Sequence, residues 1–273
     1  MDEIYDHSRV EVSVFSIRLL YFVSACMIMM IAEHRYPRRP RVEGRWTRWP
    51  VNISMTLLNS LFARFTVGAV PYQVATSFQS DGHGLLNVVG IGGWAAILIT
   101  WVLLEGVIYW QHRLFHKIPL LWRLHQVHHS DRDLDFTSGT RFHPFEILGS
   151  LLIKVVVVAF LGADPLGYLI FEISLNIGSI FNHSNVRLPL AVDRALRWIL
   201  VTPDMHRIHH SVEAYEHHRN FSFTLSIFDR IFGSYCGQPN LGQEKVILGL
   251  REYNEDSSLS LGRLLKMPFQ QKP

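Results

Sequence analysis

Residues 85–104 form a run of twenty amino acids without a charged side chain. An α-helix of about 20 residues is about 30 Å long, which matches the hydrocarbon core of a bilayer. This run therefore predicts a transmembrane helix over Leu85–Leu104. It constrains the chain to folds that expose part of their surface to lipid.

Two earlier runs also predict membrane spans. Val12–Ala32 is apolar except for Arg18. Ile53–Ala75 is apolar except for Arg64, and Pro71 interrupts it late. With Leu85–Leu104 they give three expected crossings in the first part of the chain.

Two further apolar runs, Ile147–Ala163 and Leu166–Asn182, lie on either side of a Gly-Ala-Asp-Pro segment that favours a turn. Each run holds one charged residue, Lys154 in the first and Glu172 in the second. This pattern predicts a helical hairpin over residues 147–182 that enters the membrane and returns.

The composition indicates that part of the chain lies outside the bilayer. Only 18% of the residues are charged, against about 25% in soluble domains. The mean hydropathy of +0.14 is nevertheless too low for a chain made only of spans. We therefore expect an all-α fold, a multi-span helical membrane protein with a cytoplasmic helical cap.

The distribution of arginine predicts the orientation. Six arginines lie between residues 35 and 48, whereas residues 65–104 contain neither Lys nor Arg. The positive-inside rule places that loop in the cytoplasm, so the acidic N-terminus lies outside and residues 111–146 and 183–273 lie in the cytoplasm. We divide the chain into residues 1–110 (N-terminal tail and three transmembrane helices), 111–236 (histidine-rich catalytic region with the hairpin) and 237–273 (C-terminal cytoplasmic tail).

The basic residues favour a membrane surface over nucleic acid as the partner. The net charge is +3, with 21 Arg and 5 Lys that cluster beside apolar runs. Only two cysteines, Cys26 and Cys236, are present, so neither a disulfide framework nor a thiolate metal site is expected. Histidine is the abundant metal-ligand type.

Twelve of the fifteen histidines lie between residues 112 and 218. His112 and His116 are spaced i, i+4, which places both on one helix face. The pattern His-x-x-His-His occurs twice, beginning at His125 and at His206. These are metal-ligand spacings, and two copies of the longer pattern are far beyond chance.

Eight or nine imidazoles are too many for one tetrahedral ion, which takes four ligands, so the spacing predicts two metal ions. Imidazole binds Fe, Zn, Cu and Ni, and ligand type alone does not choose among them. Histidines at a headgroup surface, in a polar core or in a pH sensor are the non-metal alternatives. A membrane zinc transporter or metal-responsive protein is the alternative that keeps the metal.

The same segments resemble the fatty acid hydroxylase and sterol desaturase superfamily over about residues 105–235. The resemblance rests on the three histidine motifs and on the short stretches Arg141–Pro144, Phe181–Pro189 and Asp229–Gly233. It implies an integral membrane, non-haem di-iron enzyme that hydroxylates or desaturates an apolar lipid such as a fatty acyl chain or sterol. Dioxygen as co-substrate and an external electron donor or reductase are implied with it.

The resemblance also implies a set of nine metal ligands, with no other catalytic residue. These are His112, His116, His125, His128, His129, His183, His206, His209 and His210.

Several other residues are candidates for positions behind the ligands. His143 is expected to support the site or to begin a helix at Pro144 rather than to bind metal. Asp131 and Asp204 lie close to the histidine motifs, and Glu105 lies seven residues before His112 on the same helix face. His217 and His218 fall where relatives usually carry other polar residues, so a ligand role for them is not expected.

Overall fold

The computed structural model describes residues 7–253 and 260–270, with side chains from residue 14 onward. The acidic residues at positions 2, 3 and 6 of the expected outer tail lie outside the described residues. The described part is helical and contains no β-strand, which confirms the all-α prediction. Its α-helices are α1 (His7–Arg35), α2 (Arg45–Arg64), α3 (Val70–Ser80), α4 (Leu85–Val88), α5 (Gly93–Lys117), α6 (Pro119–His129), α7 (Pro144–Leu161), α8 (Pro165–Asn182), α9 (Leu190–Leu196), α10 (Pro203–His209), α11 (Ala214–His217), α12 (Ile227–Ile231) and α13 (Leu261–Lys266). The 3-10 helices are η1 (Ser138–Thr140), η2 (Arg251–Tyr253) and η3 (Met267–Phe269).

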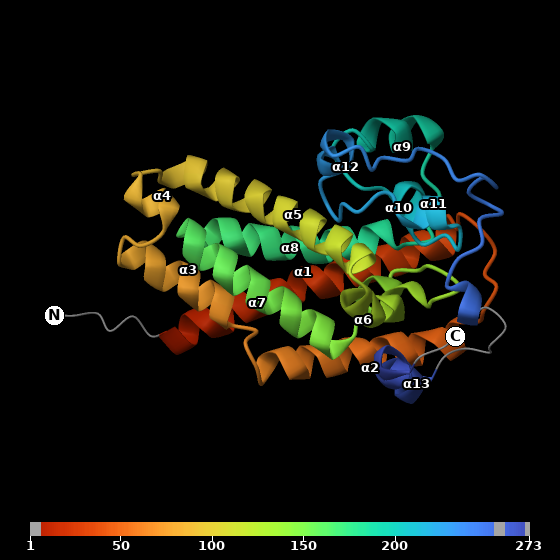
Figure 1. Ribbon diagram of the computed structural model, residues 1–273, viewed down its shortest axis with the longest axis horizontal. Coiled ribbons are helices and arrows are strands. Elements are labelled where there is room, and N and C mark those ends of the chain that lie inside the picture. Colours follow the sequence, from red (N-terminus) through yellow and green to blue (C-terminus); the bar gives the residue numbers. More distant parts are fainter. Residues whose placement is uncertain (1–6, 254–259, 271–273) are drawn as a thin grey trace.

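The long helices form a bundle with α8 in its centre (Figure 1). Helix α8 packs against α5 and α1, while α3 packs against α7. The short helices α9 to α12 gather at one end of the bundle, and α4 lies at the other (Figure 1). We call the first of these the cap end, and all of the histidine motifs converge there.

The expected helical hairpin is present as α7 and α8. His143 caps the start of α7 by accepting a hydrogen bond from the backbone N–H of Phe145, and Asp164 does the same for α8 through Gly167. Between them Gly162 has a φ of +60°, and a Cβ there would lie 2.3 Å from the carbonyl oxygen of His83. Glycine is therefore required where the hairpin turns against the α3–α4 loop.

The other two internal spans differ from expectation. Leu85–Leu104 is not one helix: α4 ends at Val88, and α5 begins only at Gly93. Gly90 and Gly93 have positive φ values of 72° and 60°. This backbone conformation, which glycine adopts readily, interrupts the helix, although the hydropathy of the segment is continuous. The membrane-length helix in this region is α5. It begins and ends later in the sequence than the expected span, so it carries the first histidine motif. The domain boundary expected after residue 110 thus falls inside α5.

Ile53–Ala75 is likewise two helices, because α2 ends at Arg64 and α3 begins at Val70. The expectation of one span over Ile53–Ala75 was therefore wrong. Both helices still pack against α7.

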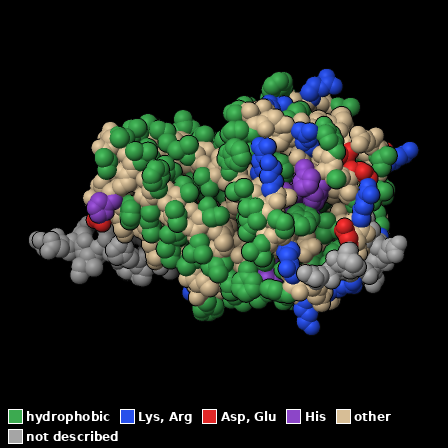
Figure 2. Space-filling view, viewed as in Figure 1, with side chains coloured by type: hydrophobic (Ala, Val, Ile, Leu, Met, Phe, Trp, Pro, Cys, Tyr) green, Lys and Arg blue, Asp and Glu red, His purple; other side chains and the backbone are tan. Residues whose placement is uncertain are grey.

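Among the described residues, three helices are long and apolar enough to cross a membrane, namely segments Val14–Arg35, Gly93–Lys117 and Pro144–Leu161. Large apolar side chains project from them into the surroundings, among them Leu20 of α1, Trp94 of α5 and Phe160 of α7, each at least 65% exposed. Figure 2 shows hydrophobic side chains over the surface of the bundle, whereas Lys and Arg gather at the cap end. This surface belongs to a membrane protein.

Three charged residues inside the apolar helices α1, α7 and α8 pair with one another. The Glu172 carboxylate of α8 accepts hydrogen bonds from Lys154 of α7 at 2.5 Å and from Tyr168 at 3.0 Å. Arg18 of α1 also pairs with Glu172. These contacts explain how three apolar segments each tolerate a charge: the ion pairs face the bundle and tie its helices together.

Candidate metal centre

The nine histidines expected as ligands lie together at the cap end in two groups. The five-histidine group consists of His112, His116, His125, His129 and His209, and the four-histidine group of His128, His183, His206 and His210. Within each group, one ring nitrogen of every residue lies within 4.8 Å of the others. A metal–imidazole bond is about 2.1 Å long, so nitrogens on opposite sides of one ion lie about 4.2 Å apart. Small adjustments would allow each group to surround one ion.

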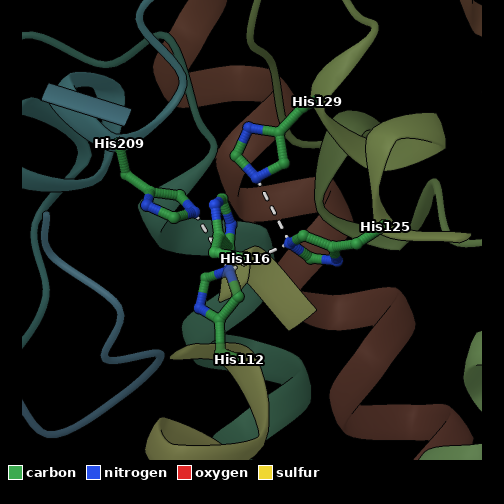
Figure 3. A group of neighbouring side chains, drawn as sticks. All are labelled: His112, His116, His125, His129 and His209. Atoms are coloured by element: carbon green, nitrogen blue, oxygen red, sulfur yellow. Dashed lines mark hydrogen bonds between the residues drawn. The ribbon is translucent and has the colours of Figure 1, made fainter. Parts of the chain in front are cut away.

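The helices divide each motif between the two groups. In α6, His125 and His129 share the five-histidine group, while His128 faces the other. At α10 the assignment is reversed, because His206 and His210 share the four-histidine group and His209 crosses to the first. The i, i+4 residues thus stay together, and the residue between them serves the neighbouring group. Figure 3 shows the five rings of the first group converging from α5, α6 and α10.

The ring nitrogens that face one another lack the protons needed to bond together. The Nδ1 atoms of His112 and His209 lie 2.6 and 2.7 Å from the backbone carbonyl oxygens of Phe221 and Arg219. A carbonyl only accepts, so both Nδ1 atoms carry the proton, and in neutral rings both Nε2 atoms are bare. Those Nε2 atoms are only 2.9 Å apart. Two facing lone pairs repel at this distance, and a cation between them removes the conflict.

In the four-histidine group the ring of His183 is oriented in the same way as those of His112 and His209. Its Nδ1 faces the carbonyl oxygen of Ser179 at 2.7 Å, which leaves Nε2 bare. The Nε2 atoms of His128 and His206 lie 3.0 and 3.1 Å from it. The donor set of each group therefore fits a metal ion.

Burial keeps these imidazoles neutral. Burial and the neighbouring imidazoles lower the pKa of His209 and of His206 well below the usual value of 6.5. Burial lowers the pKa of His125 to about 3 and that of His183 to about 4. Neutral imidazole is the form that binds metal, so the protein holds its histidines ready for a cation.

Glu146 is the one acidic side chain with a described bond to an imidazole of either group. Its Oε1 atom lies 2.6 Å from Nδ1 of His125, at the first turn of α7. A carboxylate behind a metal-binding histidine fixes the ring orientation and raises its basicity. The sequence did not predict this role of Glu146, because the contact with His125 forms only when α7 packs beside α6.

The acidic residues that were expected behind the ligands bind arginines instead. Asp131 accepts two hydrogen bonds from Arg48, at 2.7 and 2.8 Å, inside a buried network with Arg141. Burial raises the pKa of Asp131, but Arg48 and Arg141 lower it more, so it stays charged. Asp204 pairs with Arg38 at 3.1 Å and with Arg207. These ion pairs hold the loops that carry the histidines.

The remaining candidates also lie outside the two groups. Glu105 is buried in α5 and accepts a hydrogen bond from Ser174 of α8 at 3.3 Å. His143 is the N-cap of α7, and its Nε2 lies 3.3 Å from the carbonyl oxygen of Leu265. The expected helix start at Pro144 is confirmed.

Two backbone carbonyl groups that orient imidazoles of the site could not be found from the sequence. The carbonyls of Arg219 and Phe221 orient two imidazoles from a loop, and any residue type supplies a carbonyl. That loop is held by Asn220, which has a φ of +55° and bonds through its side chain to Met205 and Cys236. The Asp229 carboxylate accepts from the backbone N–H of Phe221 at 2.8 Å.

The fold and the site together define a helical membrane protein with a histidine-rich centre, able to hold metal, at one end of its bundle. Comparison with known proteins agrees with this class. Residues 97–234, about half of the chain, match the fatty acid hydroxylase family, and the chain belongs to that family. The resemblance noted in the sequence is thereby confirmed.

Several characterised proteins are similar to this chain. Alkylglycerol monooxygenase of Xenopus tropicalis is 30% identical over 167 residues, covering 58% of this chain and 34% of that protein. Ornithine lipid hydroxylase OlsE of Rhizobium tropici is 31% identical over 144 residues, covering 52% and 42%. Methylsterol monooxygenase 2-2 of Arabidopsis thaliana is 26% identical over 226 residues, covering 81% and 84%.

The chain spans about a third of the length of the alkylglycerol monooxygenases that it matches. No solved structure matches the chain.

Proposed function

We propose that this protein is a membrane-bound, non-haem di-iron oxygenase that hydroxylates or desaturates an apolar lipid with dioxygen and external electrons. The observation that carries the proposal is the convergence of nine buried imidazoles in two groups, with bare nitrogens facing one another, at the end of an apolar bundle. Its family membership and the oxygenase names of its relatives support the same reaction class.

The nine histidines would hold two iron ions, one in each group. Iron bound in this way supplies the activation of dioxygen that an unreactive C–H bond requires. The chain's own contribution is to keep the imidazoles neutral, to fix their orientation through Glu146 and the carbonyls of Arg219 and Phe221, and to exclude water.

The stoichiometry of hydroxylation requires an electron donor. One C–H bond and one O–O bond are broken, one oxygen atom enters the substrate and the other leaves as water. This balance consumes two electrons and two protons that neither the lipid nor dioxygen supplies. We infer that a separate reductase delivers the electrons.

The lipid would reach the site from the bilayer. Helix α5 carries His112 and His116 on its last turns, so the five-histidine group lies directly beyond an apolar, membrane-length helix. The proposed topology has several spans, with the N-terminus outside and the histidine motifs in the cytoplasm. It follows from the arginine-rich loop at the cap end.

Metal content tests this function most directly. The protein is purified in detergent without chelator and reconstituted anaerobically with ferrous iron, and metal is counted per chain by plasma mass spectrometry. We expect about two irons per chain and oxygen-dependent consumption of a lipid substrate. The double variant H209A/H210A, which removes one ligand from each group, should bind much less iron, form no product and still insert into membranes.

Undiminished turnover in H209A/H210A would disprove the ligand assignment. Zinc that iron cannot displace would instead favour the transporter alternative. Nothing in the comparisons points to a transporter, because the relatives named above are monooxygenases and hydroxylases.

A further inference from the structure

His217 and His218 form a row of imidazoles that leads to the five-histidine group without belonging to it. The ring of His217, in α11, lies 4.5 Å from that of His129 and 4.8 Å from that of His116. The ring of His218 lies 5.4 Å from that of His217. Since His217 is buried and His218 is exposed, the row runs from solvent to the group.

These residues line a pocket in the cap. It has a volume of about 730 Å³, and its wall includes His116, His217 and His218. His116 is buried, and neither of its ring nitrogens has a hydrogen-bond partner. The pocket therefore brings solvent-accessible space to a ligand-capable imidazole. Figure 2 shows histidine side chains at the surface of the cap end, next to Lys and Arg.

The lining of the pocket carries no net positive charge that would repel a divalent cation. Two carboxylates, Glu213 and Glu252, line it with two arginines, Arg123 and Arg251, so its charge is balanced. Arg251 pairs with Glu213 at 2.7 Å. One ring nitrogen of His217 bonds to the backbone of Ser211, which leaves the lone pair of the other for a cation.

The four-histidine group has no such approach through its own residues. All four of its histidines have an exposed fraction of 0%, and none of them lines this pocket. The five-histidine group, by contrast, meets the pocket at His116.

We propose that His217 and His218, with the pocket they line, form a metal-access site that captures a divalent ion from solvent and passes it to the five-histidine group. The ion is held there in transit, exchanging water for imidazole one ligand at a time. This role rests on the proposed metal centre but not on the identity of the lipid or on the oxidation reaction.

Loading kinetics test the proposal. The full chain is purified without metal in detergent, and uptake of Co²⁺ is followed by the visible absorption of its imidazole complexes. The final metal content is counted separately. In H217A/H218A we expect initial uptake to be at least about tenfold slower, because the two imidazoles that first bind the ion are missing, while the final content equals that of the wild type.

Two further variants make the result decisive. H34A removes an exposed histidine at the end of α1 that does not line the pocket, and it should load at the wild-type rate. H218A removes only an exposed side chain, so it should fold even where the double variant does not, and it should show partial slowing.

Unchanged rates in H218A and in the double variant would overturn the proposal. A final content lower by one ion would also overturn it, because His217 would then be a permanent ligand. If the wild type itself bound no Co²⁺, the metal centre and the proposed function would fail instead, which is a distinct result.

Discussion

The two histidine groups use the same helices but are supported differently. In the five-histidine group, outer ring nitrogens are bonded by Glu146 and by the carbonyls of Arg219 and Phe221, which come from distant parts of the chain. In the four-histidine group, Ser179 of the same helix orients His183, and the Nδ1 atoms of His128, His206 and His210 have no partner. Three of the five imidazoles in the first group are therefore oriented by such bonds, whereas one of the four in the second group is. In the first group, His116 and the Nδ1 atom of His129 have no partner either.

The groups also differ in ligand number and in access. The first offers five imidazoles and borders the pocket, while the second offers four and is wholly buried. The two histidine groups are therefore not equivalent. The five-histidine group has one imidazole more than a tetrahedral ion needs and meets the pocket, whereas the four-histidine group has none to spare and does not line that pocket.

The largest expected effect follows from ligand number. H206A leaves three imidazoles in the four-histidine group, so that group should lose its metal and product formation should fall by at least about 100-fold. H116A leaves four in the other group, which should keep its ion and lose only about tenfold in activity. Metal content and turnover of each variant measure the contrast.

H143A is the matched control, because His143 lies outside both groups. It should retain both ions. Equal metal loss in H206A and H116A would show that the groups do not differ in the way their ligand numbers indicate.

Removing the carboxylate behind His125 should weaken only the five-histidine group. We expect E146A to reduce the metal affinity of that group about 10-fold to 100-fold, and E146Q, which keeps an oxygen acceptor, to reduce it less. Competition for the metal with a coloured chelator measures the metal affinity of each variant. The control E105Q alters a buried glutamate without a bond to either group and should leave metal binding unchanged.

Acidification should destabilise the metal-free protein. The folded pKa of His125 is about 3 and its usual value is 6.5, so the unfolded chain binds protons more readily between these values. The stability of the metal-free protein is therefore greatest above pH 6.5 and falls as the pH decreases toward 3. Thermal unfolding as a function of pH measures this fall.

Protons also compete with metal for the imidazoles, so bound metal should be released on acidification, first from the group that borders the pocket. Metal retained after rapid desalting at each pH reports the order. Simultaneous release of both ions would contradict the proposed difference in access.

The smallest effect concerns the packing of the four-histidine group. The ring of Phe142 stacks on that of His128 at 4.3 Å with an interplanar angle of 10°. Such a contact is worth about 0.5–1.5 kcal/mol, so F142L should weaken metal binding there by about threefold to tenfold. F136L, whose ring contacts Trp49 instead, is the control and should bind metal normally.

The parts of the fold that were predictable depend on local chemistry. The hairpin of α7 and α8 was expected because two apolar runs lie on either side of residues 162–165, a segment that favours a turn. In the structure Gly162 ends α7 and Pro165 starts α8. The Leu85–Leu104 span was misplaced because hydropathy averages over a window and does not register Gly90 and Gly93, whose backbone conformation ends the helix.

The site also contains residues that the sequence predicted and one that it did not. The nine histidines were expected together, and the structure brings them together. Glu146 was missed because it contacts His125 only after α7 packs beside α6, and nothing in the intervening sequence marks that contact.

The sequence by itself determined that the protein has apolar, membrane-length helices and metal-binding histidine spacings, because both are properties of a single helix with 3.6 residues per turn. Only the tertiary structure decided which histidines share a group, which carbonyls orient them and which group meets the pocket. Those features depend on contacts between segments far apart in the chain, such as Nε2 of His112 against Nε2 of His209 at 2.9 Å, and such distances are set by helix packing rather than by local preference.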